Sequence, residues 1–179
     1  MSAFDTILCP VDFSEASARA LRYAAALAER FRARLSVLHA IDPILVNAAA
    51  AAYRMQMLEE DMRAELDAWV TTTVSPISCC PSRSTVVSSG RPHREILKLA
   101  ERETVDLIVM GTRGRRGCAR LFEGSATARV LRQTSIPTLV VPVDGSAAPS
   151  GADGSLNLAG PVLTLADSGH MSSQVLRFA

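Results

Sequence analysis

Short apolar runs alternate with helical patterns along residues 1–143, and this alternation limits the fold more than any other feature of the sequence. Most of the runs are apolar at nearly every position, which is typical of strands covered on both faces of a parallel sheet. The segments between them repeat apolar residues every three or four positions, as amphipathic helices do. We therefore expect an α/β domain with five strands, over residues 6–11, 35–41, 84–88, 105–110 and 138–143.

Helices are predicted between these strands. Ser14 is a suitable N-cap for a helix that ends near Phe31, and Pro92 is suited to the first position of another. A longer helix over residues 47–72 carries an apolar stripe that we interpret as core, formed by Met55, Leu58, Met62, Leu66 and Trp69. A last helix is predicted over residues 124–134.

The expected sheet is parallel, has helices on both faces and follows the strand order 3-2-1-4-5. Right-handed crossovers leave few topologies for such a sheet. The third strand is the most polar, as suits an edge. The first and fourth strands are then neighbours at the switch point, where a crevice opens at the carboxyl ends of the strands. Asp12 follows the first strand and Gly111 follows the fourth, so we expect both at this crevice.

Glycines and arginines follow the fourth strand. Gly111, Gly114 and Gly124-Ser125 allow the backbone to approach an anion, and a helix beginning at Gly124-Ser125 would present free N–H groups to it. The charge of the loop agrees, since Arg113, Arg115, Arg116 and Arg120 against Glu123 give 4 − 1 = +3. The alternative interpretation is a solvated arginine run, with Ser125 as an ordinary N-cap.

The complete string of Gly111, two residues, Gly114, nine residues and Gly124-Ser125 resembles the nucleotide motif of the ATP-binding branch of the universal stress protein family. The resemblance covers about residues 3–143, and it implies that ATP binds at the switch point. It places Pro10, Val11, Asp12 and Ala40 on the nucleoside side. It places Gly111, Thr112, Arg113 and Gly114 around the phosphates, with Gly124, Ser125, Ala126 and Thr127 presenting N–H groups and hydroxyls.

Four positions qualify this interpretation. Glu123 would repel a polyphosphate unless Mg²⁺ or an arginine neutralises it, so we expect Mg²⁺ to accompany the nucleotide. Ala126 and Ala40 stand where the family more often has valine, and at Ala40 the contact to adenine is expected from main-chain atoms. Asp12 has an alternative role in capping the first helix.

The expected function is an ATP-binding signalling or stress-survival module, and at most a weak enzyme. No Walker A string, dinucleotide fingerprint or nucleophile elbow occurs, and His39, His93 and His170 show no metal-ligand spacing. Two alternatives stay open: slow ATP hydrolysis or autophosphorylation on Ser125 or Thr127, and a nucleotide-independent interaction module. Cys118 lies among the arginines, which would make its thiol easier to oxidise.

The composition excludes other classes. A chain of 179 residues suits one well-buried domain, and its net charge of +1 argues against nonspecific nucleic-acid binding. No secretory signal is visible, and no apolar run approaches the ~20 residues of a membrane span. The four cysteines show no C-x-x-C spacing, so we expect free thiols in a reducing cytoplasm.

The carboxyl-terminal part differs from the domain, which we assign to residues 1–144. Residues 145–160 are rich in Gly, Ser and Ala and read as a flexible linker. Residues 162–179 align without a gap on residues 7–24, with Leu163, Asp167, Ser172, Leu176, Arg177 and Ala179 falling on identical residues. We interpret residues 161–179 as the start of a truncated second repeat; a chance amphipathic tail is the alternative.

The last strand of the domain, Thr138–Val143, is predicted to lie at a sheet edge. An exposed apolar edge invites pairing with another copy, and the resemblance implies dimers. We therefore expect a homodimer through this strand, an adenine nucleotide as ligand, an unknown signalling partner, and no nucleic acid or membrane.

Overall fold

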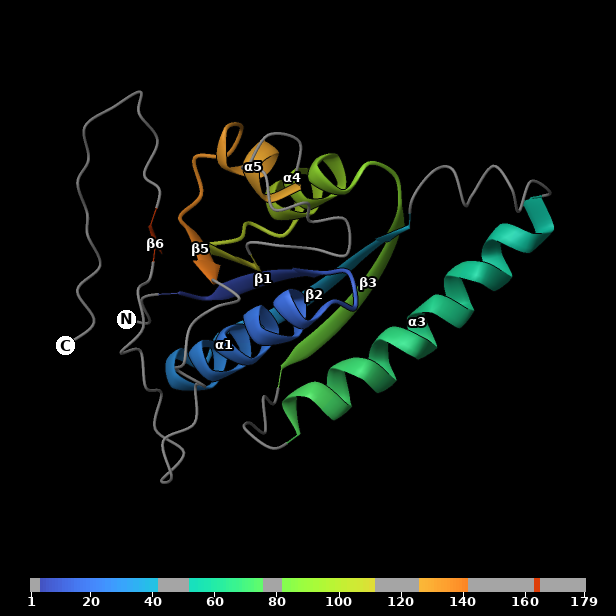
Figure 1. Cartoon of the computed structure of the whole chain (residues 1–179), viewed down its shortest axis with the longest axis horizontal. Coiled ribbons are helices and arrows are strands. Elements are labelled where there is room, and N and C mark those ends of the chain that lie inside the picture. The colour runs from blue at the N-terminus through green and yellow to red at the C-terminus, as the bar shows by residue number, and fades with distance from the viewer. Residues whose placement is uncertain (1–3, 42–51, 76–81, 112–125, 142–162, 165–179) are drawn as a thin grey trace.

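The computed structural model describes residues 4–41, 52–75, 82–111, 126–141 and 163–164 (Figure 1). Its strands are β1 (Thr6–Val11), β2 (Arg34–Ile41), β3 (Arg83–Ser89), β4 (Leu107–Gly111), β5 (Thr138–Val141) and β6 (Leu163–Thr164). Its helices are α1 (Glu15–Phe31), α3 (Ala52–Val74), α4 (Pro92–Arg102) and α5 (Ala126–Leu131).

The strands form one sheet in the order β3-β2-β1-β4-β5-β6. The first five are parallel to one another, which confirms the predicted α/β fold and its 3-2-1-4-5 order. β1 pairs with β2 along its whole length, whereas its ladder with β4 joins Ile7 to Leu107 and Leu8 to Ile108. β1 and β4 are thus neighbours at the switch point, as predicted.

Helices cover both faces of the sheet (Figure 1). Alternate residues of β1 divide between the two cores, because successive side chains of a strand point to opposite faces. Ile7 and Cys9 pack with α1 and α3, whereas Leu8 packs with α4 and α5. Alanines of α1, among them Ala20, Ala24 and Ala28, let this helix lie close to the strands. A mostly aliphatic sequence therefore still builds two dense layers.

The helix boundaries follow local chemistry. Ser14 caps α1 as predicted, since its side chain accepts a hydrogen bond from the Ser17 N–H. Pro92 occupies the first turn of α4, also as predicted. α3 begins at Ala52 and ends at Val74, while residues 47–51 of the predicted helix lie outside the described residues. α5 ends at Leu131, earlier than the predicted residue 134.

The predicted start of the fourth strand at Val105 was wrong, because β4 begins at Leu107. Asp106 instead binds the chain at the start of β1. Its N–H donates to the Thr6 carbonyl at 2.9 Å, and its carboxylate accepts from the N–H groups of Asp5 and Thr6 at 2.8 and 2.9 Å. Gly111, which the sequence assigned to the loop, is the last residue of β4.

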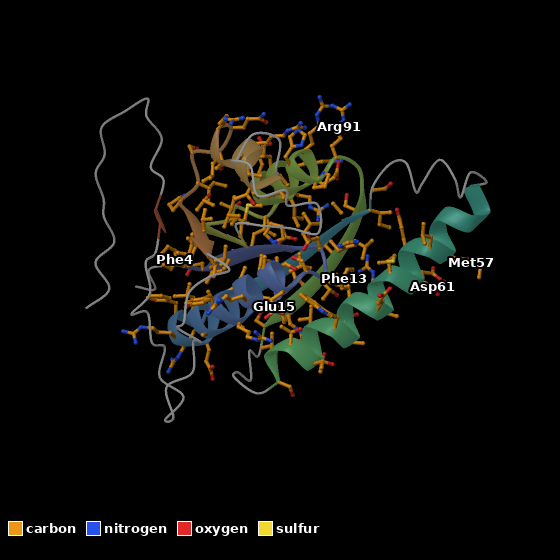
Figure 2. All side chains as sticks on the ribbon, viewed as in Figure 1. Phe4, Phe13, Glu15, Met57, Asp61 and Arg91 are labelled. Atoms are coloured by element: carbon orange, nitrogen blue, oxygen red, sulfur yellow. The ribbon has the colours of Figure 1, made fainter. Side chains whose placement is uncertain are left out.

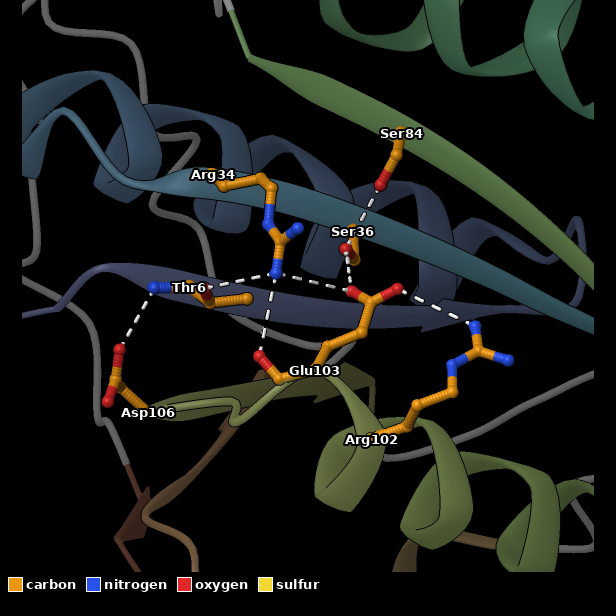
Figure 3. A network of polar contacts seen from close by, with 7 residues as sticks. All are labelled: Thr6, Arg34, Ser36, Ser84, Arg102, Glu103 and Asp106. Carbon is orange, nitrogen blue, oxygen red and sulfur yellow. Dashed lines mark hydrogen bonds and ion pairs between the residues drawn. The ribbon is translucent and has the colours of Figure 1, made fainter.

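A polar network lies at the amino ends of the strands, opposite the switch-point crevice (Figure 3). The fully buried Ser36 hydroxyl donates to Glu103 Oε2 at 2.5 Å and lies 3.1 Å from the Ser84 hydroxyl. Glu103 also pairs with Arg34 at 3.8 Å and Arg102 at 3.7 Å. The network satisfies a buried polar group, so we assign it a role in stability.

The prediction that the fifth strand lies at the sheet edge needs correction. β6 pairs antiparallel with β5, with Leu139 opposite Thr164 and Val140 opposite Leu163. The edge of β5 is therefore occupied by a segment of the same chain (Figure 1). Pro142 and Val143 of the predicted strand lie outside the described residues.

β4 ends in close contact with the first turn of α1. A Cβ atom added to Gly111 would lie 2.6 Å from the Ala16 carbonyl oxygen and 2.8 Å from its carbonyl carbon. These are backbone atoms, which cannot move aside as the end of a flexible side chain can. Glycine is therefore required at residue 111 by packing, whatever else it does.

We expect Gly111→Ala to lower the free energy of unfolding by about 1–3 kcal/mol, because α1 and β4 must separate to admit the methyl group. Urea denaturation measures this loss. Met110→Leu is the matched control, since it conserves volume at the neighbouring buried position and should cost less than about 1.5 kcal/mol. A Gly111→Ala variant as stable as the wild-type chain would contradict the contact.

Candidate functional site

The loop between β1 and α1 holds Asp12 in a fixed position. Oδ1 of Asp12 accepts from the Ser14 hydroxyl at 2.5 Å and from the Ser14 N–H at 3.2 Å. The Asp12 N–H donates to the Ser17 hydroxyl at 3.3 Å. Asp12 thus supports the capping residue Ser14, in line with the alternative role considered for it, while its half-buried carboxylate stays at the carboxyl end of β1.

Three chain segments meet at Gly111. Ala16, in the first turn of α1, lies against Gly111 from one side. The Thr127 hydroxyl, from the start of α5, donates to the Gly111 carbonyl at 3.0 Å. The first turn of α1, the end of β4 and the start of α5 are therefore held together around one residue that has no side chain.

β2 brings Ala40 to the same edge of the sheet. Val11, the last residue of β1, pairs with His39, so Ala40 lies one residue beyond the end of β1. Ala40 is half-buried, as are Pro10 and Asp12, and Val11 is buried. The structure thus places the four predicted nucleoside-side residues along adjacent strand ends.

Several predicted site residues cannot be placed. Thr112, Arg113, Gly114, Gly124 and Ser125 lie outside the described residues, and so do Glu123 and Cys118. Ala126 begins α5 and is half-buried, whereas Thr127 is buried and its hydroxyl proton is engaged by Gly111. At Thr127, the structure thus favours a role in joining α5 to β4.

An aromatic cluster, formed by Phe13, His39 and Trp69, lies beside Asp12 and was missed by the sequence reasoning. The Phe13 ring centroid is 4.7 Å from that of His39 and 5.3 Å from that of Trp69. Phe13 has a φ of 61°, in the left-handed region that few non-glycine residues adopt. One feature of the sequence could have revealed this cluster. A bulky aromatic residue, Phe13, stands between Asp12 and Ser14, in the turn that must precede the helix.

The titratable groups described by the structure give no catalytic pair. Burial raises the pKa of the Cys9 thiol, which keeps it protonated and unreactive. Burial and the charges of Arg129, Arg94 and Arg91 lower the pKa of His93, so this side chain on α4 is neutral at pH 7. Within the described ranges, no group of three His, Cys, Asp or Glu residues is arranged to hold a metal ion.

The helices that the structure describes include none long and apolar enough to cross a membrane. What the described site offers is backbone at a glycine, one positioned carboxylate and an aromatic cluster.

Comparison with known proteins gives consistent results. The family model of the universal stress protein family matches residues 3–142. A universal stress protein of Thermus aquaticus is 34% identical over 138 residues, which cover 77% of this chain and 98% of that protein. The solved structure of MJ0577, named as a universal stress protein of Methanocaldococcus jannaschii, superposes with a TM-score of 0.65 at 26% identity and covers 80% of this chain and 99% of that one.

A universal stress protein solved in complex with cAMP shares the fold, with a TM-score of 0.57 at 23% identity over 79% of this chain and 98% of that one. The matched region spans β1 to β5 and contains every described residue of the site. The chain therefore belongs to the universal stress protein family.

Proposed function

We propose that this protein is an ATP-binding signalling or stress-survival module that holds its nucleotide at the switch point between β1 and β4. One observation carries the proposal: the first turn of α1, the end of β4 and the start of α5 converge on Gly111 at the carboxyl end of the sheet. The carboxyl edge of a parallel sheet at its switch point is where ligands bind in this class of fold.

In this proposal the described residues take the nucleoside side. Asp12 accepts hydrogen bonds from nucleoside hydroxyls, and its contacts with Ser14 fix its orientation before the ligand arrives. The backbone of Ala40 meets the adenine edge, while Pro10 and Val11 form the floor. Gly111 is packed against Ala16 on one side but is only half-buried, so part of it stays accessible at the end of β4.

The phosphate side of the proposal rests on the sequence. Gly111, Thr112, Arg113 and Gly114 surround the phosphates, while Gly124, Ser125, Ala126 and Thr127 offer N–H groups and Ser125 also offers its hydroxyl. Mg²⁺ would neutralise phosphate charge near Glu123. We also propose a reducing cytoplasm as the place of action, in keeping with the free thiol of Cys9.

Isothermal titration with MgATP tests the site. We expect Asp12→Ala to weaken binding about tenfold or more, because a hydrogen bond to a charged group contributes about 1.5–3 kcal/mol. Ser14→Ala is the matched comparison: it removes the helix cap and one of the two hydrogen bonds that orient Asp12, and it leaves the carboxylate itself present.

Ser14→Ala should lower stability by about 1 kcal/mol and weaken ATP binding less than Asp12→Ala does, because the backbone N–H of residue 14 still donates to the carboxylate. Equal losses of affinity in both variants would mean that Asp12 acts through the cap alone. Adenosine and cAMP are titrated alongside ATP, since a protein of the same fold was solved with cAMP. A wild-type chain that binds none of them at millimolar concentration would favour a nucleotide-independent interaction module.

We further propose a homodimer formed through β5. Its edge accepts an antiparallel strand, and pairing of two identical strands about a two-fold axis is antiparallel. In this structure that place is taken by β6, so the two pairings compete for one set of backbone groups.

Thr164→Pro should therefore shift the chain toward the dimer in analytical ultracentrifugation, because proline cannot donate to the ladder with Leu139. Ser155→Pro, within the predicted linker, serves as the control and should behave like the wild-type chain. If all three proteins stay monomeric at every concentration tested, β5 does not mediate a dimer.

A further inference from the structure

The aromatic cluster links the loop between β1 and α1, which carries Asp12, to α3. No predicted ligand residue lies on α3. Phe13 lies between Asp12 and Ser14, His39 lies on β2, and Trp69 lies on α3. Figure 2 labels Phe13, which lies between α1 and α3. The cluster therefore joins three separate elements at the residue that follows Asp12.

Phe13 adopts a backbone conformation that an isolated phenylalanine disfavours. Its φ of 61° brings the Cβ atom too near the backbone, which is why glycine and asparagine are the usual residues there. Such a conformation persists only where the surrounding contacts offset its cost. At Phe13, the hydrogen bonds between Asp12 and Ser14 hold the turn, and the contacts of the Phe13 ring add to them.

Two partners hold that ring. The Trp69 ring meets it nearly edge-on, with a centroid separation of 5.3 Å and an interplanar angle of 74°. The His39 ring lies 4.7 Å away at 55°, and its Nδ1 is 3.0 Å from the Val11 carbonyl oxygen. Edge-to-face contacts at these separations are favourable for aromatic rings. Phe13 is thus fixed from α3 and from β2.

The consequence for Asp12 follows from the chain path. The left-handed turn at Phe13 folds Ser14 back so that both its N–H and its hydroxyl reach Asp12 Oδ1. If Phe13 moved to an ordinary conformation, Ser14 would leave Asp12 and the carboxylate would lose the contacts that orient it. Phe13 therefore controls the carboxylate through the backbone.

We propose that Trp69 is a positioning residue of the nucleotide site, which acts through Phe13 on Asp12. This inference rests on the proposed function, because it assigns a role toward the same ligand. It extends the site to α3, which otherwise packs on α1 and β3. Movement of α3 would thereby alter nucleotide affinity without touching the nucleotide.

Ordinary core packing is the competing role for Trp69, whose half-buried side chain also contacts the larger core. The two roles differ in what they predict. Packing alone changes stability and leaves the affinity for ATP unchanged. If Trp69 positions the site, the affinity for ATP falls when the aromatic contact between residue 69 and Phe13 is lost, even in a chain that is fully folded.

The first experiment compares Trp69→Phe with Trp69→Leu by titration with MgATP at a temperature where both are folded. Phenylalanine keeps an aromatic ring against Phe13 and should hold affinity within about twofold, whereas leucine should weaken it by about three- to tenfold. Glu103→Ala is the control. It removes the polar network at the amino ends of the strands, far from Asp12, and should reduce stability without changing the affinity for ATP. Equal affinity in the two Trp69 variants and the wild-type chain would overturn the proposal.

The second experiment compares Phe13→Gly with Phe13→Ala. Both lack the ring, but glycine adopts a φ near 61° without strain and alanine does not. We expect the glycine variant to bind ATP more tightly than the alanine variant. Identical affinities would show that the left-handed turn does not position Asp12.

Trp69 also provides a readout that needs no nucleotide, since it is the only tryptophan of the chain. Its emission spectrum and near-ultraviolet circular dichroism should change in ligand-free Phe13→Ala, and an unchanged signal would mean that the cluster does not form. A wild-type chain that binds no ATP overturns the proposed function and this inference together. A chain that binds ATP with Trp69→Leu unaffected overturns this inference alone.

Discussion

The site depends on the close approach of β4 to α1 at Gly111. A side chain at this residue would meet the Ala16 carbonyl, so glycine lets the first turn of α1 lie against the end of β4. The Thr127 hydroxyl ties α5 to the carbonyl group of Gly111 itself. A glycine that the sequence motif associates with phosphate is therefore also the residue at which α1, β4 and α5 meet, and the two roles do not exclude each other.

Much of the fold could be predicted because the governing interactions are local or repetitive. The continuous apolar runs of β1, β2 and β4 indicated strands buried on both faces, and right-handed crossovers left few topologies, among them the expected order that the structure shows. Ser14 was recognised as an N-cap from chemistry within its own turn. Topology also predicted that the strands before Asp12 and Gly111 are neighbours, and the structure adds a contact between Gly111 and Ala16.

What could not be predicted depends on partners that are distant in sequence. Val105 and Asp106 read as strand because their apolar neighbours do, yet the Asp106 carboxylate binds backbone N–H groups about a hundred residues away. The contact between Phe13 and Trp69 joins a turn to a helix, so no periodicity reveals it. The pairing of β6 with β5 depends on where the chain returns after residue 144. The resemblance supplied the ligand and the residues of the phosphate side.

The most direct test of the central claim is the ligand that the protein retains when it is purified. Denaturing the protein and separating the supernatant by ion-exchange chromatography identifies any adenine nucleotide and its amount per chain. The account predicts ATP or its hydrolysis product in the wild-type sample, and markedly less in Asp12→Ala. A wild-type sample that carries no adenine nucleotide, and takes none up after incubation with MgATP, would contradict it.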